Sequence, residues 1–155
     1  MDNAMNDVPL RKVKVTQLRR IPTPDGEVRH CMRAQDEGFA GFGEVYVTEV
    51  YGGATKGWKR HREMTMNLVV LRGTVRFIVH DGTREGCQIH VLSAEDGALY
   101  ARLTVPPGLW MAFQGVAPGS NLLLNIASHA HDPAEADRAE LADFAASLPS
   151  TDAGR

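Results

Sequence analysis

KGWKRHREMTMNLVVLRG, residues 56–73, has the spacing of a metal-binding β-barrel motif but lacks most of its ligands. That motif places two histidines two residues apart, a glutamate five residues after the second, and a glycine seven residues further on. The corresponding residues here are Lys59, His61, Met66 and Gly73. Side chains alternate between the two faces of a strand, so Lys59 and His61 are expected to share one face. The spacing of the motif is kept, and His61 is the one conventional metal ligand left in it.

A second motif of the same kind lies further along the chain. Its pattern is P-x-G followed three residues later by histidine, and it falls on Pro106–Gly108 and Met111. Paired motifs with this spacing are typical of a double-sheet jelly roll of the cupin type. A catalytic metal site needs about three protein ligands, and Lys59 would repel a cation. We therefore expect neither a metal nor another cofactor.

The rest of the chain predicts short strands separated by turns. Alternating or continuous apolar segments are bounded by Gly, Pro and Asp, which indicates roughly nine or ten strands and no βαβ units. The expected strands cover residues 13–18, 27–32, 44–51, 67–71, 74–80, 88–92, 99–105, 109–115 and 121–127. The predicted fold class is all-β, a double-sheet jelly-roll (cupin) barrel.

The tail is the one segment with a helical pattern. Asp132 is a suitable N-cap, and Pro133 fits the first helical position. Leu141, Phe144 and Leu148 follow at helical spacing. The sequence thus predicts a short amphipathic C-terminal helix lying on a sheet.

Length and charge limit the other possibilities. The 155 residues suit one domain, which we place at 10–148, with flexible segments at 1–9 and 149–155. A net charge of -2 argues against broad binding to nucleic acid. The absence of a long apolar run and of a signal-like N-terminus predicts a cytoplasmic protein without membrane association.

Several blocks of the sequence together resemble a known family. In order and spacing, the chain resembles the metal-free cupins of deoxysugar biosynthesis, above all the dTDP-4-dehydrorhamnose 3,5-epimerases and their shorter relatives. The matching blocks are PDGEVRHCMR (24–33), FGEVYVTEVYGGATKGWKRHREMT (42–65), LRGTVRFIVHDG (71–82), LTVPPGLWMAFQGV (103–116) and NIASHAHDPAE (125–135). The resemblance implies a homodimer whose partner molecule is a nucleotide-linked sugar, a dTDP- or other NDP-4-keto-hexose.

The resemblance also implies a reaction. Such enzymes remove a proton from C3 or C5 beside the 4-ketone and return one to the opposite face, which is general acid–base chemistry. The family's base lies in R-G-x-H, which aligns with residues 56–59 and places Lys59 at the base. The next histidine of the shorter relatives is kept as His61. The family's acidic tyrosine aligns only loosely with residues 129–133, and the carboxylate that orients the base has no recognisable counterpart.

Three residues are the expected catalytic groups. His61 has the ordinary pKa for proton abstraction near neutrality. Lys59 acts as a base only if its pKa is strongly lowered; otherwise it binds phosphate or stabilises an enolate by its charge. Tyr46 lies in the middle of a predicted strand, at a position suited to face the barrel interior.

Six further residues are expected to bind substrate. Basic side chains beside the motif can hold a pyrophosphate or form an exposed edge of a strand. Buried asparagines need hydrogen-bond partners, and a ligand in the cavity is one possible partner. A tryptophan after the PPG turn can line the mouth of the barrel or fill the core. These residues are Lys56, Arg60, Arg62, Asn67, Trp110 and Asn125.

Three functions remain open from the sequence. The first is a metal-independent epimerase acting at C3 and/or C5 of a nucleotide-linked 4-keto-deoxysugar. The second is a sugar 3,4-ketoisomerase using His61. The third is a non-catalytic nucleotide-sugar-binding cupin, which Lys59 favours more than any other residue does.

Overall fold

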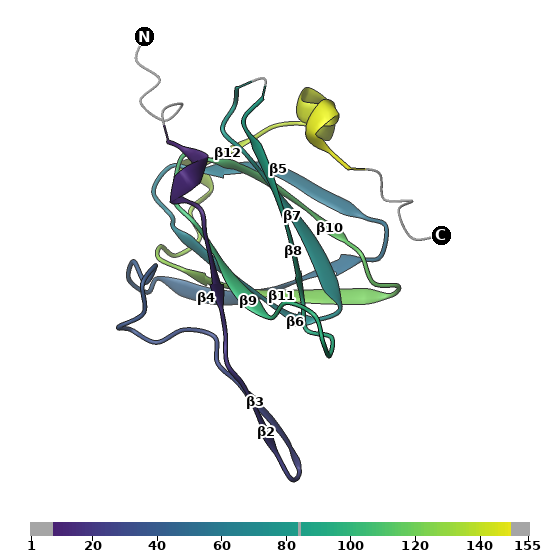
Figure 1. The fold of residues 1–155 in the computed structure, drawn as a ribbon. Coiled ribbons are helices and arrows are strands. Elements are labelled where there is room, and N and C mark those ends of the chain that lie inside the picture. The colour runs from purple at the N-terminus through teal and green to yellow at the C-terminus, as the bar shows by residue number, and fades with distance from the viewer. Residues whose placement is uncertain (1–7, 84, 150–155) are drawn as a thin grey trace.

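Two five-stranded antiparallel sheets face one another in the computed structural model, which describes residues 8–83 and 85–149 (Figure 1). The first sheet has the order β1 (Lys14–Gln17), β9 (Ala101–Val105), β6 (Met66–Arg72), β11 (Ser120–Ala127) and β4 (Glu44–Tyr51). The second has the order β12 (Ala136–Arg138), β5 (Thr55–His61), β10 (Trp110–Gly115), β7 (Thr74–His80) and β8 (Cys87–Ser93). The predicted all-β, double-sheet jelly roll is confirmed.

The core lies between the sheets because both present apolar residues to the inside. Leu68 and Leu103 of the first sheet and Phe77 and Val79 of the second are at most 1% exposed. β6 is the central strand, and its residues 66–70 are all buried, as its continuous apolar run predicts. The flexible segments predicted at 1–9 and 149–155 fall outside the described residues, apart from residues 8, 9 and 149.

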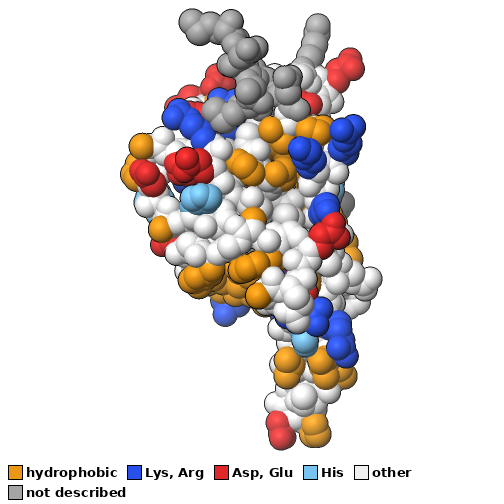
Figure 2. Space-filling view, turned by 90° about the vertical axis from the view of Figure 1, so that its left-hand side faces the viewer, with side chains coloured by type: hydrophobic (Ala, Val, Ile, Leu, Met, Phe, Trp, Pro, Cys, Tyr) orange, Lys and Arg blue, Asp and Glu red, His pale blue; other side chains and the backbone are white. Residues whose placement is uncertain are grey.

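A hairpin leaves the two-sheet body near the N-terminus. It consists of β2 (Arg20–Thr23) and β3 (Gly26–Arg29), which pair only with each other (Figure 1). The whole of β3 is exposed, and Val28 is 51% exposed. In Figure 2 this arm extends below the body and displays hydrophobic side chains beside basic ones.

The C-terminal segment corrects one prediction. Instead of one amphipathic helix, the chain forms the 3₁₀ turn η3 (Pro133–Glu135), the strand β12 and the 3₁₀ segment η4 (Leu141–Ser147). Residues 136–138 take the open edge of β5, where their backbone groups pair with a neighbouring strand instead of with a helical turn. The predicted contacts survive this change: Leu141, Phe144 and Leu148 pack on the outer face of the sheet against Trp58. Asp132 also caps η3, accepting a bond from Ala134 N.

No helix in the described ranges is long and apolar enough to cross a membrane.

β5 contains a bulge that determines which of its side chains face inward. Lys59 pairs with Met111 and Lys56 with Phe113, so two residues of β5 lie opposite the single residue Ala112. The extra residue shifts the alternation by one position. Lys56 and Lys59 therefore both line the interior although they are three residues apart.

Gly57 makes this bulge possible. A Cβ added there would lie 2.6 Å from Ala112 Cβ and 2.8 Å from Ala112 Cα. We expect Gly57→Ala to lower the free energy of unfolding by about 2 to 3 kcal/mol, measured by urea denaturation, because the two strands would have to separate. Gly53→Ala is the matched control, since Gly53 also has a positive φ (85°) but its added Cβ meets nothing within 4 Å. Equal losses in the two variants would contradict the close-packing argument.

Candidate active site

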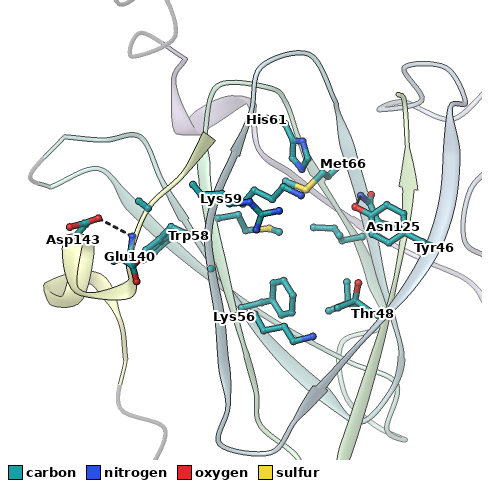
Figure 3. Close-up of a pocket in the computed structure, with 17 residues that line it drawn as sticks. Tyr46, Thr48, Lys56, Trp58, Lys59, His61, Met66, Asn125, Glu140 and Asp143 are labelled. Carbon is teal, nitrogen blue, oxygen red and sulfur yellow. Dashed lines mark hydrogen bonds between the residues drawn. The ribbon is translucent and has the colours of Figure 1, made fainter. Parts of the chain in front are cut away.

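A cavity of about 580 Å³ lies between the two sheets (Figure 3). Its size is in the usual range for small-ligand sites. The apolar part of its lining comes from both sheets and includes Met66, Leu68, Met111, Phe113 and Leu123. Polar side chains from β4, β5, β11 and β12 complete the wall, together with Glu140, which follows β12, and Asp143 of η4.

His61 is the best-supported functional group in this cavity. It is 4% exposed, and its Nδ1 contacts Glu135 Oε1. A carboxylate at Nδ1 favours the tautomer that carries its proton there, which leaves Nε2 as the proton acceptor. Burial lowers the pKa of His61 below its ordinary 6.5, while the hydrogen bond and charge of Glu135 act in the opposite direction. The residue is therefore a neutral, oriented base near pH 7.

Glu135 is itself held firmly. Its other oxygen, Oε2, accepts bonds from the backbone N–H groups of Arg62, Glu63 and Met64 at 3.2, 3.1 and 3.3 Å. Burial acts to raise the pKa of Glu135, but the bonds from His61 and from the amides of Glu63 and Met64 lower it overall. An ionised carboxylate thus lies behind the imidazole, 74 residues away in sequence.

Cationic side chains line the same side of the cavity as His61. Lys59 and Lys56 of β5 and Arg138 of β12 all line the cavity, and Arg138 pairs in register with Lys59. Burial lowers the pKa of Lys59 from its ordinary 10.5, the charge of Arg138 lowers it further, and Glu135 raises it. This wall favours an anionic ligand, and repulsion from Arg138 makes the charge on Lys59 less favourable.

The opposite wall carries Tyr46 and Asn125. Asn125 Nδ2 donates to Tyr46 Oη at 2.9 Å, and Asn125 Oδ1 accepts from the backbone N–H of Asn67 at 3.1 Å. Because the phenol oxygen is the acceptor in the first bond, its own O–H remains able to donate to a ligand. Tyr46 belongs to the first sheet and His61 to the second, so the two groups reach the cavity from opposite sides (Figure 3).

Three expected binding residues lie outside the cavity. Arg60 on the outer face of β5 and Arg62 just after this strand both form salt bridges with Asp137 of β12. Arg60 also lies over the ring of Trp110, 4.6 Å from its centroid. Trp110 packs on that outer face against Phe144. Strand alternation explains the placement, because the neighbours of these residues point inward.

Asn67 is also outside the cavity. Its neighbours on β6 line the interior, so its side chain points to the other face of the sheet. There it donates to Gly38 O at 3.0 Å and accepts from Thr104 Oγ1 at 2.6 Å. Its partners are therefore the covering loop and a neighbouring strand, which corrects the expectation that it contacts a cavity ligand.

Sequence reasoning missed the two charged residues that act on His61 and Lys59, which are Glu135 and Arg138. Both lie in the segment whose sequence pattern predicts a helix, and a helix would not pair with β5. The available signal was the D-P-A-E turn at residues 132–135, which follows the last long strand and places a carboxylate near its end.

The metal-motif positions do enter the cavity, but with unsuitable groups. Lys59, Met66 and Met111 line it beside His61. Within residues 8–83 and 85–149, no three His, Cys, Asp or Glu side chains are grouped so that they could hold a metal ion. The donor set present here does not fit a divalent cation.

Comparisons with known proteins agree on the kind of fold. A crystal structure of a dTDP sugar isomerase from Desulfovibrio desulfuricans G20 is 29% identical, with a TM-score of 0.82 and 95% of each chain covered. QdtA, a sugar 3,4-ketoisomerase from Thermoanaerobacterium thermosaccharolyticum solved with TDP, is 20% identical, with a TM-score of 0.70 and coverage of 89% of this chain and 96% of its own. ChmJ, a 3'-monoepimerase from Streptomyces bikiniensis, is 19% identical in its complex with dTDP-quinovose, with a TM-score of 0.75 and coverage of 91% and 78%.

A family model matches most of the chain. A search of curated proteins found no match. The family described as "FdtA: WxcM-like, C-terminal" matches residues 11–147. The comparisons support the broader resemblance to deoxysugar isomerases and do not single out the dTDP-4-dehydrorhamnose 3,5-epimerases. With a match over nearly its whole length, the chain belongs to the FdtA, WxcM-like C-terminal family.

Proposed function

We propose that this protein is a metal-independent epimerase acting at C3 and/or C5 of a nucleotide-linked 4-keto-deoxysugar. The observation that carries the proposal is the placement of a carboxylate-oriented imidazole, His61, across a cavity from the phenol of Tyr46. The similar structures add support, since their names include a dTDP sugar isomerase, a 3,4-ketoisomerase and a 3'-monoepimerase.

The proton transfers follow from this geometry. A 4-ketone acidifies the C–H bonds at C3 and C5, and His61 Nε2 accepts one of these protons as the electron pair moves onto O4. Lys59 and its positive charge stabilise the resulting enolate oxygen. Tyr46 then donates its hydroxyl proton to the carbon from the opposite side, which inverts the configuration. Solvent exchange returns Tyr46 and His61 to their starting protonation states.

The nucleotide diphosphate is assigned to the cationic side of the cavity. Lys56 and Arg138 line it together with Lys59, and charge-assisted bonds to phosphate oxygens are strong. In Figure 3, Lys56 lies toward one end of the cavity and His61 toward the other, with Lys59 between them. The diphosphate would thus occupy the Lys56 end and the sugar the His61 end.

Two alternatives are kept because particular residues favour them. A 3,4-ketoisomerase would also use His61, and one of the similar structures carries that name. A nucleotide-sugar-binding protein without catalysis would explain why Lys59 stands at the family's base position. The exchange experiment below separates catalysis from binding alone, and the position of the carbonyl in the product separates an epimerase from a 3,4-ketoisomerase.

Hydrogen exchange tests the proposed reaction. The protein is incubated with dTDP-4-keto-6-deoxyglucose in D₂O, and deuterium at C3 and C5 is followed by NMR. We expect exchange that His61→Ala lowers by about 100-fold or more, because the base is lost. Ligand binding measured by calorimetry without any exchange would support the binding protein instead. Exchange unaffected in His61→Ala but lost in Lys59→Ala would move the role of base to Lys59.

The pH dependence tests the contact between His61 and Glu135. His61 accepts a proton only when neutral, so the exchange rate should fall as the pH drops through its pKa, below 6.5. Glu135→Gln removes an interaction that raises this pKa, so the acid limb should move to lower pH. The plateau rate should also fall by about 10- to 100-fold, because the imidazole loses its orienting partner. Glu63→Gln is the control, since this neighbouring carboxylate is exposed; an equal shift in both variants would contradict the pairing.

We also propose that a second copy of the chain contacts the β2–β3 arm. An isolated two-stranded hairpin is only marginally stable in water, and this one exposes Val28. β4 is an edge strand of its sheet and leaves Val45 and Val47 48% and 53% exposed, which offers an apolar surface to such an arm.

Light scattering after size exclusion checks this assembly. We expect the natural chain to have the mass of a dimer and Val28→Glu to weaken the dimer by at least about tenfold in Kd, because a charge would be buried. Ile89→Glu, at a residue 49% exposed on β8, should leave the mass unchanged. A monomeric natural chain would refute the proposal.

A further inference from the structure

We infer that Lys59 confines this site to proton exchange at carbon, so that the ketone stays at C4 and the protein does not act as a 3,4-ketoisomerase. The inference rests on the proposed function, since it concerns the same keto-sugar in the same cavity. It makes Lys59 the residue that determines which of two related reactions follows enolate formation.

The two reactions differ in what happens at oxygen. In epimerisation at C3, one proton leaves C3 and another arrives at C3, so O3 remains a hydroxyl and O4 a ketone oxygen. In ketoisomerisation, a proton leaves C3 and one arrives at C4, while O3 loses its hydrogen and O4 gains one. The second reaction therefore needs a group near O3 and O4 that can both donate and accept a proton, in addition to the base that acts on carbon.

Lys59 occupies the place where such a group would have to be. It is two residues from His61 on the same face of β5 and projects into the cavity (Figure 3). In the part of the chain that the structure describes, its Nζ forms no salt bridge, and so it remains available to a ligand oxygen. An ammonium group offers three donors and no lone pair. It can hold an enolate oxygen but accepts the O3 proton only after it has lost one of its own.

The groups around Lys59 do not supply the missing function. Met111 lies opposite it in register on β10, and Met66 lies beside it on β6. A thioether neither donates nor accepts a proton at neutral pH. His61 uses Nδ1 for Glu135 and has Nε2 for carbon, while Tyr46 comes from the opposite wall. A single imidazole with a single ammonium beside it thus suits transfer at carbon alone.

Substitution with histidine should add the missing relay. An imidazole at position 59 can donate from one nitrogen and accept at the other, on the same wall as His61. We expect Lys59→His to move the carbonyl from C4 to C3 at least about 100-fold faster than the natural chain, which is the usual contribution of a positioned acid–base group. Lys59→Arg is the matched control, because it keeps a cation that has no lone pair to offer; it should show no migration.

The experiment uses dTDP-4-keto-6-deoxyglucose labelled with ¹³C at C3 and C4, in D₂O, with ¹³C NMR to locate the carbonyl and the deuterium. The natural chain is expected to incorporate deuterium at C3 or C5 while the carbonyl remains at C4. Carbonyl migration by the natural chain would overturn the inference and leave isomerase chemistry standing. The natural chain alone thus decides the main point even if Lys59→His fails to fold, which circular dichroism would reveal.

The remaining outcomes are also distinguishable. Neither exchange nor migration in the natural chain would refute the proposed function together with the inference. A folded Lys59→His variant that still exchanges deuterium but never moves the carbonyl would show that Lys59 does not determine the outcome. Reduction with borohydride during turnover should leave the protein mass unchanged; a sugar adduct on Lys59 would mean that it reacts as a nucleophile and would equally overturn its assigned role.

Discussion

The pairing of β12 with the edge of β5 is the interaction on which the site depends. It sets Ala136 opposite His61 and Arg138 opposite Lys59, and the turn before it brings Glu135 against the imidazole. Asp137 secures the pairing from outside through Arg60 and Arg62. Arg60 and Arg62, which the sequence suggests as diphosphate ligands, thus hold the strand that carries Arg138 into the cavity. Without that strand, His61 would have neither its partner nor its cationic surroundings.

The interior face of β5 depends on a second constraint, the bulge at Gly57. Regular alternation would place Lys56 and Lys59 on opposite faces, and one inserted residue brings them to the same face. The motif spacing in the sequence therefore describes only the half of β5 that contains Lys59 and His61. The bulge turns the other half, with Lys56, into the cavity. The bulge needs glycine at position 57, because Ala112 leaves no room for a side chain there.

The fold and part of the site were predictable because they depend on local patterns. Alternation identified the strands and placed Lys59, His61 and Tyr46 inward, and it would also have placed Arg60 and Arg62 outward had it been applied as strictly. Glu135 and Arg138 were not predictable in this way. Their roles arise from a contact across 74 residues, and the three-residue strand that makes it has no periodicity of its own. Leu141, Phe144 and Leu148 have helical spacing in the sequence, but they pack on Trp58 from a segment that is not an α-helix.

The replacement of a ligand by Lys59 changes the electrostatics of the whole site, beyond the loss of a metal ligand. Burial is the main reason that the pKa of His61 is low, and the charge of Lys59 adds to it. Glu135 opposes both effects but does not outweigh burial, so the pKa of His61 stays low and the imidazole is neutral while hydrogen-bonded to an ionised partner. A site with a neutral base and a cation close beside it is suited to take a proton from carbon and to hold the negative charge that results. Lysine at this position is therefore compatible with catalysis. His61 supplies the base that a metal-bound water would otherwise provide, and Lys59 supplies the positive charge that a metal ion would otherwise provide.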